Sequence, residues 1–158
     1  MIARKPIWKT IPGNCMSEKC DDHGHAVIPG DGYDQPVFID MDCVAGSNTC
    51  RLLRGHDTRC DYLFFGWHKP YRRQCIGVIE MKLGMPDASK VISQLKAGAA
   101  CVEKLVCQDD RIQFRPVVVH GNKVPKADRD RLRVQKIKLF GKGVVIRLRK
   151  REARFPMK

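Results

Sequence analysis

Two short apolar runs, residues 59–65 (RCDYLFF) and 75–82 (CIGVIEMK), constrain the fold of this chain more than any other feature. Both runs are rich in strand-favouring residues, and each holds charged side chains near one end. The segment between them, residues 66–74, contains Gly66, Pro70 and several polar side chains. An antiparallel hairpin is the simplest connection for such a segment. We therefore predict two neighbouring antiparallel strands.

The register of this hairpin brings charged side chains together. In the second run, alternation places Glu80 and Lys82 on one face. A symmetric hairpin sets Phe65 opposite Ile76. Asp61 then faces Glu80, with Cβ atoms roughly 5 Å apart. Opposed carboxylates destabilise a sheet unless a cation neutralises them, and Mg²⁺ is typically held by one or two carboxylates with water and phosphate. A structural ion pair at a strand end is the alternative interpretation.

This arrangement resembles the D…(D/E)XK signature of the PD-(D/E)XK nuclease superfamily, the fold of many restriction endonucleases and junction resolvases. Residues 60–63 (CDYL) and 79–84 (IEMKLG), followed by a helix with Gln94, are also similar to uncharacterised prokaryotic members with a CDYL…IELKG…QL pattern. The resemblance covers residues 59–119. Cys60 stands where the family normally has proline before its first aspartate.

The resemblance implies a restriction-endonuclease-like core and a metal-dependent nuclease that acts on nucleic acid, with DNA preferred. Asp61 and Glu80 would ligate Mg²⁺ or Mn²⁺, and the backbone carbonyl of Met81 is a further implied ligand. Lys82 would position or activate the attacking water. Gln94 would lie beside the metal; its structural alternative is to cap a strand carbonyl.

The clearest helix follows the second run. Asp87 has the form of an N-cap, and apolar residues from Ala88 to Val106 recur at helical spacing. Residues 111–120 then form a strand, with Pro116 near its beginning or at an edge. A strand, a helix and a strand predict parallel pairing of the outer two. We therefore expect an α/β fold with a central mixed β-sheet of four or five strands flanked by helices.

Charge is distributed unevenly along the chain. Residues 1–110 have equal numbers of acidic and basic side chains, whereas residues 111–158 hold 16 Lys/Arg against three acids, which is the whole net charge of +13. A polyanion partner is the natural inference, because such a patch releases counterions from phosphates. The candidate nucleic-acid contacts are Lys123, Lys126, Arg147, Arg149, Lys150 and Arg151. A solvated basic tail is the competing interpretation.

The N-terminal cysteines suggest a second kind of site. Cys15, Cys20, His23 and His25 have ligand types that bind Zn²⁺, although their spacing is not that of a standard finger or ribbon. Without a secretory signal, we expect the eight cysteines to be reduced, and buried thiols with polar loop histidines are the alternative to zinc.

Three further short elements are predicted outside the central hairpin and the helix that follows it. We expect a short helix near residues 14–20, a strand at residues 36–41 and a terminal strand at residues 144–149. On the strand expected at residues 36–41, Asp40 and Asp42 share one face. They would lie near the metal or be solvated at a sheet edge. Residues 126–142 satisfy helical and strand periods in part, so their structure stays open.

The chain is expected to form a single domain, residues 1–158, with an N-terminal extension and first core elements (1–55), a catalytic core (56–120) and a basic C-terminal part (121–158). No apolar run reaches the length of about 18 residues that a membrane span needs, so we expect a cytoplasmic protein without a membrane partner. A homodimer or partner subunits are compatible with the sequence. The rival functions are a non-catalytic nucleic-acid-binding module on the same fold and a zinc-stabilised interaction protein.

Overall fold

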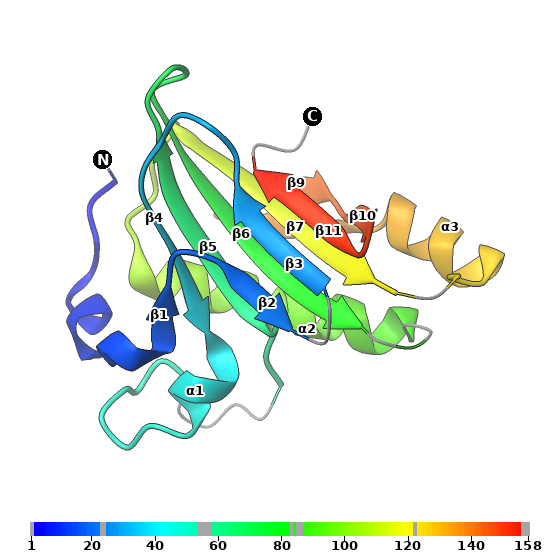
Figure 1. Cartoon of the computed structure of the whole chain (residues 1–158), viewed down its shortest axis with the longest axis horizontal. Coiled ribbons are helices and arrows are strands. Elements are labelled where there is room, and N and C mark those ends of the chain that lie inside the picture. The colour runs from blue at the N-terminus through cyan, green and yellow to red at the C-terminus, as the bar shows by residue number, and fades with distance from the viewer. Residues whose placement is uncertain are drawn as a thin grey trace.

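The computed structural model describes residues 2–22, 25–53, 58–82, 84, 87–121 and 123–155. Its centre is a six-stranded sheet in the order β1-β4-β5-β6-β7-β10 (Figure 1). The strands are β1 (Met16–Ser17), β4 (Tyr33–Asp40), β5 (Tyr62–His68), β6 (Arg73–Lys82), β7 (Ile112–His120) and β10 (Arg147–Lys150). Neighbours are antiparallel from β1 to β6 and parallel from β6 through β7 to β10. The predicted α/β fold with a mixed sheet is confirmed, with six strands in place of four or five.

The predicted hairpin is β5–β6, and its register is the symmetric one. Phe65 pairs with Ile76, and Leu63 pairs with Val78. Both strands are buried along most of their length because they lie at the centre of the sheet. Strand β7 pairs in parallel with β6, as the strand–helix–strand pattern predicted.

One face of the sheet is covered by α2 (Ala88–Leu105), which lies behind the strands in Figure 1. The helix begins as predicted, because Oδ1 of Asp87 accepts a hydrogen bond from the backbone N–H of Lys90 at 3.2 Å. Its approach to the sheet is close at Gly98. A Cβ at that position would lie 2.7 Å from Sγ of Cys60 and closer still to Cγ1 of Val78. Glycine is therefore needed for this helix to pack against β6.

The opposite face carries a second, three-stranded sheet in the order β11-β3-β2, seen in front of β6 and β7 in Figure 1. Its strands are β2 (Cys20–Asp22), β3 (His25–Pro29) and β11 (Glu152–Phe155). Val27 and Ala153 of this sheet pack against Phe64, Ile79 and Val117 of the central sheet in one apolar cluster. The central sheet is therefore buried on both faces.

Several expectations for the ends of the chain were wrong. Residues 14–20 contain no α-helix; two 3₁₀ turns, Pro6–Thr10 and Gly13–Cys15, precede β1. The single strand expected at 144–149 is divided at Ile146. Its first part belongs to β9 (Lys142–Val145), which pairs with β8 (Lys136–Leu139), and its second part is β10. These short strands are defined by their partners and not by their own periodicity.

Two other segments differ from expectation in detail. Residues 126–142, whose sequence fits helical and strand periods in part, begin with α3 (Lys126–Val134) and continue as β8. Pro116 lies in the middle of β7 and not near its beginning, and at this position β7 is paired with β6 alone, although β7 as a whole lies between β6 and β10. It is tolerated there because pairing with β10 starts only at Val117, so the missing N–H falls outside that ladder.

The strand expected at residues 36–41 is β4, which is not an edge strand. Asp40 ends it and caps the short helix α1 (Met41–Ala45), since its Oδ1 accepts a hydrogen bond from the N–H of Cys43 at 3.0 Å. Asp42 lies in the first turn of α1 and forms an ion pair with Arg59 at 2.7 Å. The two carboxylates therefore have separate roles instead of sharing one strand face.

Candidate metal centre

Asp61 lies one residue before β5, where backbone pairing with β6 ends. The last paired residues are Tyr62 and Ile79. Oδ2 of Asp61 accepts a hydrogen bond from the backbone N–H of Met81 at 2.7 Å. The backbone N–H of Asp61 also donates to the carbonyl oxygen of Ile79 in β6 at 3.1 Å, so backbone and side chain together continue the contact with this strand. This contact holds the Asp61 carboxylate next to Glu80, which is the neighbour of Met81 in β6.

Glu80 is a fully buried carboxylate in the interior of the molecule, with an exposed side-chain fraction of 0%. Nζ of Lys82 lies 2.6 Å from its Oε1, and the Lys82 side chain is 23% exposed. Among the described residues, Oε2 of Glu80 has no hydrogen-bond partner. Burial, followed by the charge of Asp61, raises the pKa of Glu80 to about 7, against the opposing effect of Lys82. Lys82 therefore neutralises the pair only in part.

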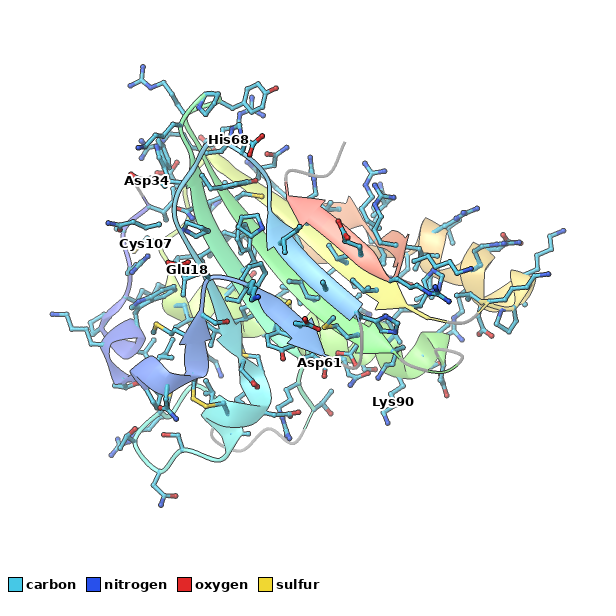
Figure 2. The ribbon with its side chains drawn as sticks, viewed as in Figure 1. Glu18, Asp34, Asp61, His68, Lys90 and Cys107 are labelled. Atoms are coloured by element: carbon cyan, nitrogen blue, oxygen red, sulfur yellow. A yellow bond between two sulfur atoms is a disulfide. The ribbon has the colours of Figure 1, made fainter. Side chains whose placement is uncertain are left out.

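An open groove of about 520 Å³ leads to Asp61. Its lining is polar and comes from α1, the segment before β5 and the first turns of α2: Asp42, Thr58, Arg59, Asp61, Lys90, Ser93 and Gln94. Figure 2 shows Asp61 and Lys90 at the same end of the molecule. The Asp42–Arg59 ion pair lies at the rim, where solvent weakens it. The groove gives a solute access to the Asp61 carboxylate.

Gln94 was predicted to face the sheet, and it lines this groove together with Asp61. Its Oε1 is buried and has no hydrogen-bond partner among the described residues. A cap on a strand carbonyl would use the Nε2 amide group, so this oxygen is left to accept from a water or another donor. Lys90 and Ser93 were not predicted. Lys90 lies three residues before Ser93 and four before Gln94 on α2, and these two spacings could have indicated side chains near one another.

The donor set fits a hard divalent cation. Two carboxylates converge, and Oε2 of Glu80 is a buried oxygen without a donor in the described part of the chain. Mg²⁺ is commonly held by one or two carboxylates while keeping several waters. No group of three or more His, Cys, Asp or Glu side chains suited to a metal occurs in the ranges that the structure describes. A cation here would therefore rely on Asp61, Glu80, water and backbone oxygen. Met81 points its side chain into the cluster on the opposite face of the sheet.

Among the described residues of the N-terminal Cys/His cluster, one predicted zinc ligand is engaged elsewhere. Cys15 forms a disulfide with Cys43, so the expectation that all cysteines are reduced was wrong for this pair. A disulfide sulfur is not the thiolate that zinc requires. Cys20 is buried and outside any disulfide, and His25 is buried with both ring nitrogens lacking hydrogen-bond partners among the described residues. His23 lies outside the described residues.

The predicted nucleic-acid contacts lie on two faces of the sheet. Lys150 pairs with His120 of β7, and His120 pairs with Lys82, so these side chains share the face that α2 covers. Arg147 and Arg149 alternate with Lys150 and therefore lie on the other face.

The remaining predicted contacts belong to loops and to α3. Lys123 is exposed just before α3, and Lys126 is the exposed first residue of that helix. Arg151 is exposed in the turn between β10 and β11, with a φ of 61°. Lys123 and Lys150 line one groove together.

Comparison with known proteins identifies no family for this chain. No protein-family model, curated protein or solved structure matches the chain. Within the described residues, no helix is both long and apolar enough to cross a membrane.

Proposed function

We propose that this protein is a metal-dependent nucleic-acid phosphodiesterase, with DNA as the preferred substrate. The observation that carries the proposal is the buried Glu80, held between the Asp61 carboxylate and the Lys82 ammonium beside an open polar groove. Burying a carboxylate next to a like charge costs stability, and such arrangements concentrate at functional sites. The resemblance to the PD-(D/E)XK nucleases supports the same residues in the same roles and supplies the preference for DNA.

Asp61 and Glu80 would hold Mg²⁺ or Mn²⁺, with the Met81 carbonyl as a further ligand suggested by the resemblance. The bound ion would polarise the scissile phosphate and lower the pKa of a water. Lys82 places a positive charge 2.6 Å from Glu80, where it positions the attacking water and offsets negative charge that develops on the phosphate. Gln94 offers its unpartnered Oε1 to a hydrogen of that water.

The test is cleavage of linear, circular, branched and single-stranded substrates with Mg²⁺ or Mn²⁺ and with EDTA. Asp61→Ala, Glu80→Ala and Lys82→Ala should each lower the cleavage rate by at least about 100-fold, because each removes a group that acts on the reacting atoms. Two exposed residues provide controls: Lys104→Ala on α2 and Asp110→Asn before β7 should cleave at the wild-type rate.

Wild-type rates in all three site variants would refute the assignment. Binding without cleavage on every substrate and metal would favour the rival function, a nucleic-acid-binding module. The third interpretation, a zinc-stabilised interaction protein, loses support from the Cys15–Cys43 disulfide. Stoichiometric zinc in the purified protein, with unfolding on its removal, would restore it.

A further inference from the structure

A second groove lies beside the candidate metal centre on the same face of the sheet. It is open, has a volume of about 380 Å³, and is lined by His120, Lys123, Val124, Arg129, Arg133, Leu148 and Lys150. Four of these side chains are cations at neutral pH, and none is acidic. A concave surface lined by one sign of charge concentrates ligands of the opposite sign. The groove is therefore suited to an anion.

The cations of this groove are available for a ligand. None of the ion pairs in the described ranges involves Lys123, Arg129, Arg133 or Lys150. Acidic side chains do occur nearby on α3, at Asp128 and Asp130, but neither lines the groove. The positive charge there is not cancelled by the protein itself.

Helical spacing places two arginines of α3 on the side of the helix that lines the groove. Arg129 and Arg133 are four residues apart and therefore lie on one face of the helix. Leu132 is fully buried and anchors α3 on the core. Arg131 is exposed and does not line the groove, although it belongs to the same helix. The positive charge that α3 contributes to the groove thus comes from one face of the helix and not from the net charge of the whole helix.

The sheet register fixes the position of this groove relative to Lys82. Lys82 pairs with His120, and His120 pairs with Lys150, so the three residues form one row across β6, β7 and β10. Neighbouring strands lie about 4.8 Å apart, which puts Lys150 roughly 10 Å from Lys82 along the sheet. In duplex DNA each strand advances about 3.4 Å per nucleotide along the helix axis, so a span of this size along that axis corresponds to about three nucleotides.

We propose that the groove binds backbone phosphates of the substrate strand about three nucleotides from the scissile phosphate. Arg129, Arg133, Lys123 and Lys150 contact phosphate oxygens and hold the strand across the ends of β6, β7 and β10. The inference rests on the proposed nuclease function for the position of the scissile phosphate, but phosphate binding in the groove is independent of cleavage.

Binding is tested by fluorescence anisotropy of a labelled single-stranded DNA oligonucleotide in EDTA, at several salt concentrations. Loss of two phosphate contacts in Arg129→Ala/Arg133→Ala should reduce the slope of log K against log salt by about 1.4 and weaken binding about 25-fold at 0.1 M salt. Arg131→Ala, the matched control on the other side of α3, should weaken binding by less than about threefold, because screening limits its effect. Arg129→Lys/Arg133→Lys should retain most of the affinity if charge is what matters.

Equal losses in the double variant and in Arg131→Ala, after correction for one charge against two, would overturn the groove as a defined site. Unchanged binding in a double variant with wild-type circular dichroism and melting temperature would also overturn it. If the double variant is unfolded, Lys150→Ala carries the same test, with the slope of log K against log salt expected to fall by about 0.7 for one lost phosphate contact.

The position of the groove is tested by substrate length. Oligonucleotides shortened stepwise from either end should show a rise in KM when fewer than about three nucleotides remain on one side of the cut. The double variant should lose this dependence of KM on length. Binding loss without any wild-type cleavage would refute the nuclease proposal and leave the groove. Cleavage with normal length dependence in the double variant would refute the groove and leave the nuclease proposal.

Discussion

Replacement of Glu80 by glutamine should make the protein more stable above neutral pH. Glu80 is fully buried, and its pKa rises from 4.5 to about 7 on folding, mainly because of desolvation. A raised carboxyl pKa stabilises the fold fully below the unfolded value of 4.5, and that stability is lost as the pH rises through 7. The difference of roughly 2.5 pKa units corresponds to about 3 kcal/mol. Glutamine has no such titration, so Glu80→Gln avoids the loss.

Urea unfolding followed by tryptophan fluorescence, from pH 4 to pH 8 in EDTA, measures this difference. The free energy of unfolding of Glu80→Gln minus that of the wild type should increase by about 3 kcal/mol over the series. Glu18→Gln, which removes an exposed carboxylate in the same way, is the matched control. Mg²⁺ should then stabilise the wild type above pH 7 more than the glutamine variant, because the variant keeps only the Asp61 carboxylate of the two that would bind the ion.

A difference that stays constant with pH would refute the reasoning, since it would mean that Glu80 does not titrate differently in the folded and unfolded states. A difference that decreases with rising pH would mean that the Lys82 ion pair outweighs burial. In that case Glu80 would be a stabilising ion-pair partner, which is the structural alternative to a metal site.

Three further predictions concern the scaffold. Gly98→Ala should lower the free energy of urea unfolding by roughly 1–3 kcal/mol, because the added methyl overlaps the central sheet; no change would mean that α2 can move away. Asp87→Ala should cost about 1 kcal/mol through loss of the helix cap, while Asp87→Asn should cost less. Cys15→Ser should cost about 3–4 kcal/mol in non-reducing buffer, because the disulfide with Cys43 spans 28 residues. Equal stability of wild type and variant under reducing conditions is the matching control.

The central hairpin and α2 were predictable because their signals are local. Alternation and a symmetric loop set Phe65 opposite Ile76, and helical spacing after Asp87 marked α2. The Cys15–Cys43 disulfide was not predictable, since the pairing depends on how 3₁₀ turns and α1 meet in space. The strands β8 to β11 are only four residues each, so their pairing partners decide their conformation.

Within the candidate site, the carboxylates and Lys82 followed from one strand register, but the groove linings did not. In the sequence, Lys90 and Ser93 look like ordinary surface residues of a helix. Only the position of α2 beside Asp61 shows that they line the groove. Arg129 and Arg133 lie in a stretch that satisfied two periodicities. Once that stretch is known to be helical, their spacing of four residues places them on one face.

The pairing of β11 with β3 bears on how the chain is made. Glu152 pairs with Ala26, so one side of the central sheet acquires its cover from strands at opposite ends of the sequence. Contacts between residues so distant in sequence form late, because a long loop must close first. During synthesis, Phe64, Ile79 and Val117 would remain without this cover until residues 152–155 leave the ribosome. A nascent chain arrested before that point exposes an apolar sheet face, which makes it a candidate for chaperone binding and aggregation.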